Sequence, residues 1–546
     1  MSQKTQGLAG IGADRDVIIV GAGPVGLCLA IELGLRGNTV TLVERADARS
    51  SQPRAKTLNM RSLEHFRRWG VADAVRAASP IEPELPTDII FQTQLYGKHI
   101  ARLPNIYFRG NIRANDSRFS EPSEWVPQPV VEGILKAKAA SLPNVSLHYG
   151  LEFTSATHDA AGVTVRLRST AGEESSLHAQ WLIGADGARS RVRELIGAKM
   201  IGRHAFAANL NMVLRIPELD AHPPFPRGIM HWIINPESPA VMGPIGDLWY
   251  VAKPLAAGAT EITQEEVGAL LEATIGRKVA FELLTTDIWF AHELIADRYR
   301  DGRVFLAGDA CHLHPPFGGY GMNLGIADAV DLGWKLDAVL HGWGGTALLD
   351  SYEFERRLVH QWTIDEAIAN YELLSHDLIR PGLECDTPEG EAIRARLATE
   401  VIEQKRREFH TIGLVLGYHY GGSPVIACDD RVAAPTVENY EPLGLCGALA
   451  PHFWLAPGIS LYDEFGSGFT LLDRTGAPKA TARLEAAAAA LGVPLKVLAI
   501  KSSEAAKLYP SPLTLVRPDQ HIAWRGDGAD AHSATQIIET VTGRST

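Results

Sequence analysis

Cysteine is scarce in this sequence. The 546 residues contain five cysteines, Cys28, Cys311, Cys385, Cys428 and Cys446, and no C-x-x-C pair. An odd number without such a pair argues against a disulfide framework, a zinc site and a thiol redox motif. The scarcity favours a reducing compartment, so we expect a cytoplasmic protein.

Long apolar runs and blocks of basic charge are also missing. No stretch of about 18 or more apolar residues occurs, and the first residues lack the continuous apolar segment of a signal peptide. Lysine and arginine total 52 against 64 acidic residues, a net charge of −12. These absences argue against a membrane, export and nucleic acid as main partner.

The length and composition indicate a multidomain globular protein. At 546 residues the chain exceeds what one hydrophobic core usually fills, and 46% hydrophobic with 21% charged residues is ordinary globular composition. Glycine is abundant, at 51 residues. The placement of these glycines carries most of the functional signal.

The first glycine cluster lies between an expected strand and an expected helix. Residues 16–20 read DVIIV, residues 21–26 read GAGPVG, and apolar residues follow at helical spacing. In this pattern the glycines permit the turn, the approach of a pyrophosphate and the packing of helix on strand, while the helix N-terminus attracts phosphate. The second expected strand, residues 39–43, ends in Glu44, which can accept hydrogen bonds from ribose hydroxyls or be an ordinary strand end. The pattern predicts dinucleotide binding without separating NAD from FAD.

A second segment joins glycine to aspartate. Three short strands are expected at residues 145–149, 151–155 and 163–167, and they lead into WLIGADGARS at residues 181–190. An apolar strand that ends in Asp186 and a glycine suits a loop beside a cofactor. Asp-Gly is also a common turn dipeptide, so a plain turn is the alternative.

The third segment is richer. Residues 303–323 read RVFLAGDACHLHPPFGGYGMN and run into an apolar helical pattern. Asp309 at the strand end could hold a ribityl or ribose hydroxyl, and amides at the helix start could face a ring carbonyl or phosphate. His312 and His314 could suggest a metal, but no third ligand with suitable spacing lies nearby, so we expect no metal site.

Together and in this order, the three segments resemble the class A FAD-dependent aromatic monooxygenases of the para-hydroxybenzoate hydroxylase and phenol hydroxylase type. The resemblance covers nearly the whole chain and includes Arg54-Ala55 and Pro127-Gln128. It implies an α/β fold with a Rossmann-type FAD-binding domain, a mixed-sheet substrate domain and a C-terminal thioredoxin-like domain. That last domain lacks C-x-x-C, so no redox role follows.

The resemblance also implies a division of the chain. The final domain is expected to read β-α-β-β-β with a closing helix, with strands at 469–472, 495–500, 513–516 and 521–524 and the first helix at 479–491. The implied domains are a discontinuous FAD-binding domain at 1–80, 113–200 and 295–375, a substrate sheet at 81–112 and 201–294, a helical connection at 376–430, and the thioredoxin-like domain at 431–546.

Cofactor contacts are implied by position. The glycine turn and Glu44 would hold the ADP half of FAD, Asp309 the ribityl chain, and the start of the following helix the flavin ring. Tyr320 departs from the family, where many relatives carry Gln or Lys. The full implied set is Gly21, Gly23, Pro24, Val25, Gly26, Glu44, Arg45, Arg54, Gln128, Asp186, Asp309, Pro316, Gly319, Gly321, Met322 and Asn323.

The implied reaction needs a cofactor, because side chains alone do not activate oxygen. In the family, NADH or NADPH reduces FAD, and a flavin C4a-hydroperoxide then hydroxylates a phenolic or other aromatic ring. The sequence has no second Rossmann fingerprint after a strand, which agrees with a nicotinamide that visits a shared groove. The expected partners are therefore a small aromatic substrate, O2 and NAD(P)H, and a homodimer is plausible by base rate.

Candidate catalytic residues are less sharply indicated. His231, Trp232, Trp249 and Tyr250 lie in the segment expected to cover the flavin, and a His or Tyr there could promote phenol deprotonation. Aromatic residues in strands also commonly form cores. We take His231, Tyr250 and the backbone at Pro316 as candidates.

Three other functions compete with phenol hydroxylation. Hydroxylation or Baeyer–Villiger oxygenation of a polycyclic or polyketide substrate suits the same fold, because fold alone does not decide chemistry. A simple NAD dehydrogenase explains only the first glycine turn. A non-catalytic flavin-binding protein leaves three intact cofactor segments without a purpose.

Overall fold

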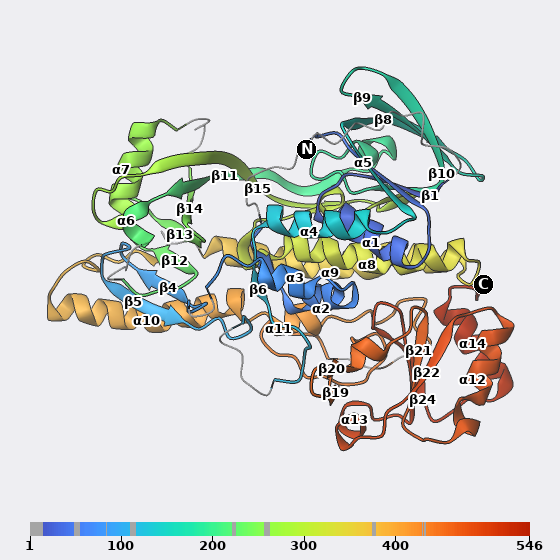
Figure 1. The fold of residues 1–546 in the computed structure, drawn as a ribbon. Helices are drawn as coiled ribbons and strands as arrows, with labels where there is room; N and C mark the ends of the chain where they lie inside the picture. Colours follow the sequence, from blue (N-terminus) through green and yellow to red (C-terminus); the bar gives the residue numbers. More distant parts are fainter. Residues whose placement is uncertain are drawn as a thin grey trace.

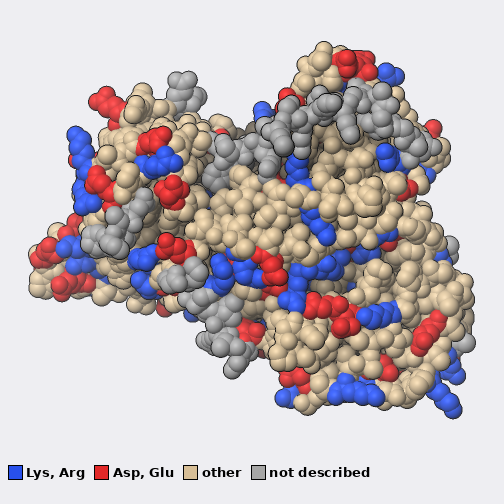
Figure 2. Space-filling model, in the orientation of Figure 1, with Lys and Arg blue, Asp and Glu red and all other residues tan. Residues whose placement is uncertain are grey.

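The computed structural model describes most of the chain. The described residues are 15–47, 55–82, 85–109, 116–220, 225–255, 262–373, 378–428, 430 and 433–545. Figure 1 shows one sheet region at the upper right and another at the left of a central layer of long helices, with the C-terminal region packed below that layer. None of the described helices is long and apolar enough to span a bilayer. Acidic and basic side chains are interspersed on the face shown in Figure 2.

The first glycine turn belongs to an eight-stranded sheet. Its order is β16-β17-β10-β1-β2-β7, with β9 pairing β10 and β8 pairing β9. The core pairs β2-β1, β1-β10, β10-β17 and β2-β7 are parallel, which agrees with the continuous apolar runs of β1 and β2. The strands are β1 (Arg15–Val20), β2 (Val40–Glu44), β7 (Val145–Tyr149), β8 (Leu151–His158), β9 (Val163–Ser169), β10 (Glu174–Gly184), β16 (Arg300–Asp301) and β17 (Val304–Leu306).

Helices cover this Rossmann-type sheet. The helix after the glycine turn, α1, packs against α8 and α4, and α8 also packs against α9. Asn59 caps α2 by accepting a hydrogen bond from the Ser62 amide. The helices are α1 (Pro24–Leu35), α2 (Met60–Arg68), α3 (Ala72–Ala77), α4 (Gln128–Ala140), α5 (Arg191–Leu195), α8 (Gly321–Leu340) and α9 (Thr346–Glu372).

A second eight-stranded sheet stands beside the first. Its order is β18-β15-β11-β14-β13-β12-β4-β5, and all pairs are antiparallel except β12-β4. The strands are β4 (Ile89–Gln92), β5 (His99–Leu103), β11 (Met200–Arg215), β12 (Met230–Ile233), β13 (Ala240–Ile245), β14 (Leu248–Pro254), β15 (Glu282–Ala296) and β18 (His312–Leu313). The nearby helices are α6 (Pro217–Asp220), α7 (Gln264–Ile275), α10 (Pro388–Phe409), which packs on β5, and α11 (Ile412–Leu416).

The C-terminal region forms a four-stranded thioredoxin-like sheet of order β22-β21-β23-β24. β22 is parallel to β21, and the other pairs are antiparallel. The elements are β21 (Phe469–Asp473), α12 (Pro478–Ala490), β22 (Leu495–Ala499), α13 (Ser503–Leu508), β23 (Leu513–Val516), β24 (Ile522–Gly526) and α14 (Ala531–Val541), preceded by the hairpin β19 (Trp454–Ala456) and β20 (Ile459–Ser460). The sequence pattern missed α13, a short helix capped by Ser502. The exact domain boundaries stay a prediction.

Buried charges join this C-terminal region to the central helices. The Arg517 guanidinium lies 2.6 Å from Glu355 on α9 and 3.1 Å from Asp331 on α8, and it also pairs with Asp519. Lys335 lies 2.8 Å from Asp331 and 2.6 Å from Glu355. Every member of this Arg517 cluster is at most 5% exposed. The charges therefore offset one another inside the interface.

One cysteine expectation needs correction. Cys428 and Cys446 form a disulfide, with their Cα atoms 6.1 Å apart. The two segments meet because both bond to β24: the Ala427 amide donates to Ala523, and the Gly447 amide donates to Ile522. Counting cysteines and searching for C-x-x-C excludes only local pairs, so this nonlocal pair was missed. Cys28, Cys311 and Cys385 are free.

Candidate active site

A cavity of ≈ 610 Å³ lies between the Rossmann-type sheet and the second sheet. Segments from all three glycine regions line it, together with aromatic side chains of the second sheet. The sequence-predicted residues in its lining are Gly21, Gly23, Pro24, Val25, Glu44, Arg45, Gln128, Asp186, Tyr250, Asp309, Pro316, Gly319, Gly321 and Met322. Gly26, His231 and Asn323 lie outside the lining, and Arg54 lies outside the described residues.

The glycine turn is shaped by close backbone contacts. Gly21 has φ +108°, and a Cβ there would lie 2.3 Å from the Ala185 carbonyl oxygen. A Cβ on Gly26 would lie 2.0 Å from the Gly21 oxygen, so Gly26 lets α1 pack on the turn. Gly23 differs, because a Cβ there would meet nothing within 4 Å. Its missing side chain leaves open space at the N-terminus of α1, which suits a bound phosphate.

Glu44 has a double role at the end of β2. One carboxylate oxygen accepts a hydrogen bond from the Ala22 amide at 2.9 Å, and the other accepts from the Ala46 amide at 2.9 Å. The carboxylate thereby braces the glycine turn while it lines the cavity. Its remaining lone pairs can accept from ribose hydroxyls. Arg45 follows as an exposed residue at the cavity edge.

Gln128 and Asp186 are both held by their own surroundings. The Gln128 side chain accepts from the Ala55 amide at 3.3 Å and donates to Glu132 at 2.8 Å. Asp186 accepts from Ser190 and from the Arg191 amide at 2.8 Å, so it fastens the loop that starts α5. Burial raises the pKa of Asp186. Both side chains line the cavity from fixed positions.

The third glycine segment forms the opposite wall. Asp309 is exposed at the cavity edge, and Pro316, Gly319, Gly321 and Met322 follow along the lining. The first amides of α8 at Gly321 and Met322 have no acceptor within the helix, as at every helix start. They are thus suited to face an acceptor on a ring.

Asn323 fastens this wall. Its side chain accepts from the Asn59 amide at 3.0 Å and from Ser62 at 2.7 Å, and it donates to Thr57 at 2.9 Å and Gly319 at 2.7 Å. These four bonds use its side-chain capacity. Asn323 therefore positions the loop, and only its backbone remains for a cofactor.

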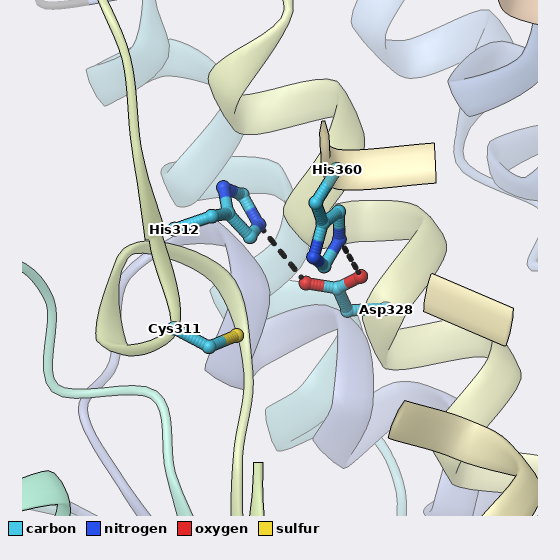
Figure 3. Close-up of side chains that lie close together, drawn as sticks. All are labelled: Cys311, His312, Asp328 and His360. Carbon is cyan, nitrogen blue, oxygen red and sulfur yellow. Dashed lines mark hydrogen bonds and ion pairs between the residues drawn. The ribbon is translucent and has the colours of Figure 1, made fainter. Parts of the chain in front are cut away.

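Figure 3 shows four possible metal ligands gathered behind this wall: Cys311, His312, Asp328 and His360. Asp328 comes from α8 and His360 from α9, so the spacing of the histidines in the third glycine segment does not reveal them. Asp328 accepts from His312 at 3.1 Å, His360 at 2.8 Å, Arg356 at 2.8 Å and the Gly308 amide at 3.0 Å. Burial alone would raise the pKa of Asp328, but His360 and Arg356 hold it well below its usual value. Both oxygens are occupied, so this cluster braces the turn at Gly308 without needing an ion.

The two side-chain candidates for catalysis lie in different places: Tyr250 lines the cavity and His231 does not. His231 is buried on the far face of β12, 3.2 Å from the Gln92 side chain and against Phe225 and Trp249, while its neighbours Met230 and Trp232 line the cavity. Burial lowers the pKa of His231 to about 3. The structure does not bring His231 to the site, because side chains alternate along a strand and the sequence left the register open.

Tyr250 does line the cavity. Its ring packs 6.1 Å from that of Trp125, and its hydroxyl lies 3.5 Å from the Ile229 carbonyl oxygen. Burial raises the pKa of Tyr250 above its usual value, so the phenol stays neutral. Tyr250 can offer a ring face and a hydroxyl, and it does not act as a base near neutral pH.

Sequence reasoning missed Lys56. Its ammonium lies 3.8 Å from the centroid of the Tyr250 ring, in the cavity lining. A lone lysine after Arg54-Ala55 carries no spacing signal of its own. The pairing of β3 (Thr57–Leu58) with β6 (Glu124–Trp125) places it beside Trp125, whose ring packs against Tyr250 of the second sheet.

Comparison with known families accounts for almost the whole chain. The FAD binding domain family matches residues 14–367, and the C-terminal domain family of aromatic-ring hydroxylases matches residues 443–545. The open space at Gly23, the acidic strand end and the glycine wall fit such a dinucleotide cofactor. The resemblance inferred from the three segments is confirmed.

Individual relatives align with this chain over nearly their full length. Aklavinone 12-hydroxylase RdmE from Streptomyces purpurascens is 34% identical over 97% of this chain and 98% of the relative. Phenol 2-monooxygenase from a Pseudomonas species is 29% identical over 97% of this chain and 93% of the relative. Among solved structures, the rebeccamycin biosynthetic enzyme RebC with reduced flavin has a TM-score of 0.89 at 32% identity, covering 97% of this chain and 99% of that chain. Aklavinone-11 hydroxylase with FAD and aklavinone has a TM-score of 0.83 at 30% identity, covering 98% and 100%. The chain therefore belongs to the FAD-dependent aromatic-ring monooxygenases.

Proposed function

We propose that the enzyme hydroxylates a phenolic ring that binds between the glycine wall of α8 and the aromatic face of the second sheet. The observation that carries this proposal is the shared cavity. Its lining joins Pro316 and Gly319 of the cofactor segments to Trp125, Trp232 and Tyr250. Apolar walls of this kind exclude water from a reactive centre.

The residues of the chain have binding and positioning roles in this proposal. FAD, when bound, would supply the redox chemistry that links NADH or NADPH and oxygen to the aromatic ring. The amides at the start of α1 and the open space at Gly23 would receive the pyrophosphate, and Glu44 would accept from the adenosine ribose. Asp309 would hold ribityl hydroxyls, and the amides of Gly321 and Met322 would face the flavin ring.

Substituting Gly23→Ala tests the cofactor site. The new Cβ meets nothing within 4 Å, and Gly23 has φ −69°, so the fold should be unaffected. The methyl group occupies space assigned to the pyrophosphate, so we expect FAD affinity to fall about 10-fold to 100-fold. Titration of the apoprotein with FAD by flavin fluorescence measures this. Gly268→Ala on α7, where the Cβ meets only Phe281 at 3.7 Å, is the matched control and should bind FAD as the wild type does. Equal affinity in both variants would contradict the assignment.

The substrate class is tested with the FAD-loaded enzyme. NADH and NADPH oxidation is measured against simple substituted phenols and polycyclic phenols, and hydrogen peroxide is counted separately. A substrate should accelerate oxidation, suppress peroxide and gain one oxygen. If no phenol is oxygenated, the hydroxylase proposal fails.

A polycyclic or polyketide substrate is the second candidate. It is favoured by the identity of 34% with a hydroxylase named for aklavinone. Product analysis separates hydroxylation from Baeyer–Villiger insertion, because only the latter converts a ketone to an ester. The homodimer and the cytoplasmic location stay predictions, which analytical ultracentrifugation and cell fractionation would test.

A further inference from the structure

Lys56 places a positive charge in the cavity wall. Its Nζ lies 3.8 Å from the ring centroid of Tyr250 and 5.8 Å from that of Trp125. Within the described residues, its ammonium makes no hydrogen bond or ion pair. Burial lowers the pKa of Lys56 to about 8, and no neighbouring charge offsets that effect. The two ring faces attract the cation but supply no acceptor atom.

The fold gives carboxylate partners to Lys405 and Lys335, which are more deeply buried than the half-buried Lys56. Lys405 also lies over a ring of the cavity wall, 3.9 Å from the centroid of Trp232, yet its Nζ is 3.2 Å from the Glu408 carboxylate. Lys335 has two carboxylates within 2.8 Å. Buried ammonium groups generally need such partners. Lys56 is half-buried, so water can solvate its ammonium in the open cavity, and a ligand that displaces this water is expected to supply the partner.

The backbone of Lys56 is fixed beside the glycine wall. The Val126 amide donates to the Lys56 carbonyl at 2.7 Å, and Asn323 donates to Thr57 at 2.9 Å. A Cβ on Gly319 would lie 3.0 Å from the Thr57 side chain. The backbone of Lys56 is thus fixed next to the proposed flavin loop, and its side chain extends to Tyr250 of the second sheet. An atom that contacts the ammonium lies in the space between these two walls.

Other titratable groups line the cavity, but among the described residues none forms a hydrogen bond or ion pair with the Lys56 ammonium. Glu408 forms an ion pair with Lys405. Burial lowers the pKa of His314 to about 4, so His314 is neutral near pH 7. The other titratable side chains in the lining are Glu44, Arg45, Tyr107, Glu152, Asp186, Arg189, Arg191, Tyr250, Lys253, Asp309, His312, His314, Tyr320 and Glu408. No hydrogen bond or ion pair joins any of them to the Lys56 ammonium among the described residues.

We propose that Lys56 binds the ionisable oxygen of the substrate, so that the substrate is an aromatic ring with a phenolic hydroxyl held as the phenolate. This inference rests on the proposed hydroxylase function. The hydroxyl proton passes from the ring oxygen to solvent water, and the Lys56 ammonium pairs with the resulting phenolate, so no other reactant is needed. The negative oxygen raises the electron density at the ortho and para carbons, where an electrophilic oxygen is accepted. Lys56 therefore selects for phenols over their ethers and directs the oxygenation.

The decisive experiment compares two probes on two proteins. The probes are 4-nitrophenol, whose phenolate absorbs visible light, and its methyl ether, 4-nitroanisole. Each is titrated into FAD-loaded wild type and Lys56→Met. Because a charge-assisted hydrogen bond is lost, we expect 4-nitrophenol to bind the variant about 10-fold to 100-fold more weakly and to lose its enhanced phenolate band. Binding of 4-nitroanisole should not change. Equal 4-nitrophenol affinity in both proteins, or equal losses for both probes, would overturn the proposal.

Two additions keep the result interpretable. Lys56→Arg retains a cation and should restore part of the phenolate band, whereas Lys56→Gln should resemble Lys56→Met and replaces it if that variant does not fold. The flavin spectrum of each variant reports cofactor retention. If the wild type binds the phenolate but oxygenates no phenol, the proposed function fails and the role of Lys56 stands. If phenols are oxygenated and Lys56→Met binds them normally, only the role of Lys56 fails.

Discussion

The buried Arg517 cluster and the half-buried Lys56 in the cavity wall are two sites of positive charge that the fold treats in opposite ways. Arg517 has three carboxylates around it, from α8, α9 and its own loop. Among the described residues, Lys56 contacts the ring faces of Tyr250 and Trp125 and no carboxylate. The Arg517 cluster is complete within the chain and lies at an interface. The Lys56 wall is incomplete within the described chain and lies in a cavity.

This difference separates structural charge from binding charge. A buried ion pair is costly to break because the remaining partner stays desolvated. A half-buried charge without a partner loses part of its hydration in the free protein and gains its partner on binding. Removing one residue from each site should therefore change stability in opposite directions.

The largest effect is expected for Arg517→Met. The substitution leaves Glu355 and Asp519 as buried carboxylates without their guanidinium, which should lower the free energy of unfolding by about 3–5 kcal/mol. Urea unfolding monitored by tryptophan fluorescence measures the change. Arg525→Met removes a pair with Asp430 whose side chains are 22% and 18% exposed, and it should cost at most about 1 kcal/mol. Equal losses would show that the Arg517 cluster is no stronger than a surface pair.

An intermediate effect is expected from His231, on the back of the sheet that carries the cavity. Burial lowers the pKa of His231 from 6.5 to about 3. Between these pH values His231 is protonated in the unfolded chain and neutral in the folded chain. Stability is therefore lost as the pH falls through 6.5 toward 3, by about 2 kcal/mol for this residue between pH 7.5 and pH 5. His231→Gln should reduce that pH dependence by this amount in urea unfolding. An unchanged slope would mean that His231 is accessible to protons in the folded state.

The smallest effect, and the one of opposite sign, is expected for Lys56→Met without ligand. Burial lowers the pKa of Lys56 to about 8 from 10.5, which penalises the charged form in the folded state at neutral pH. Replacing it with an apolar side chain should raise the free energy of unfolding by about 1 kcal/mol. In the wild type, stability should rise as the pH increases from 8 to 10.5, and the variant should lack that rise. Destabilisation of the variant would place Lys56 with the structural charges.

The local patterns of the sequence predicted most of the FAD-binding fold. Each glycine segment combines a strand, a turn and a helix within about thirty residues, so its geometry is set by neighbouring residues. The expected strand at 163–167 and helix after Asn323 agree with β9 and α8, and the expected strand at 39–43 is shifted by one residue in β2. The short helix α13 was missed.

The parts that depend on distant contacts were not predictable from one sequence. The facing of His231 depends on the register of β12 against β4 and β13, which no local pattern sets. The partners of Arg517 and the pairing of Cys428 come from segments far along the chain. Lys56 was missed because its place in the cavity, beside Trp125 and Tyr250, depends on segments far along the chain. Its lack of a bonding partner among the described residues also has no local sequence signal.

The strand order of the Rossmann-type sheet has a consequence for biosynthesis. Strand β10 is hydrogen-bonded to β1 on one side and to β17 on the other, and β17 begins at Val304, after the whole of β11 to β15. A chain emerging from the ribosome therefore holds the glycine turn long before the sheet can close. Nonlocal parallel pairing of this kind forms slowly and leaves strand edges open in the meantime. Fragments that end near residue 200 should accordingly aggregate rather than fold, and nascent chains of this protein should depend on chaperones until β17 is available.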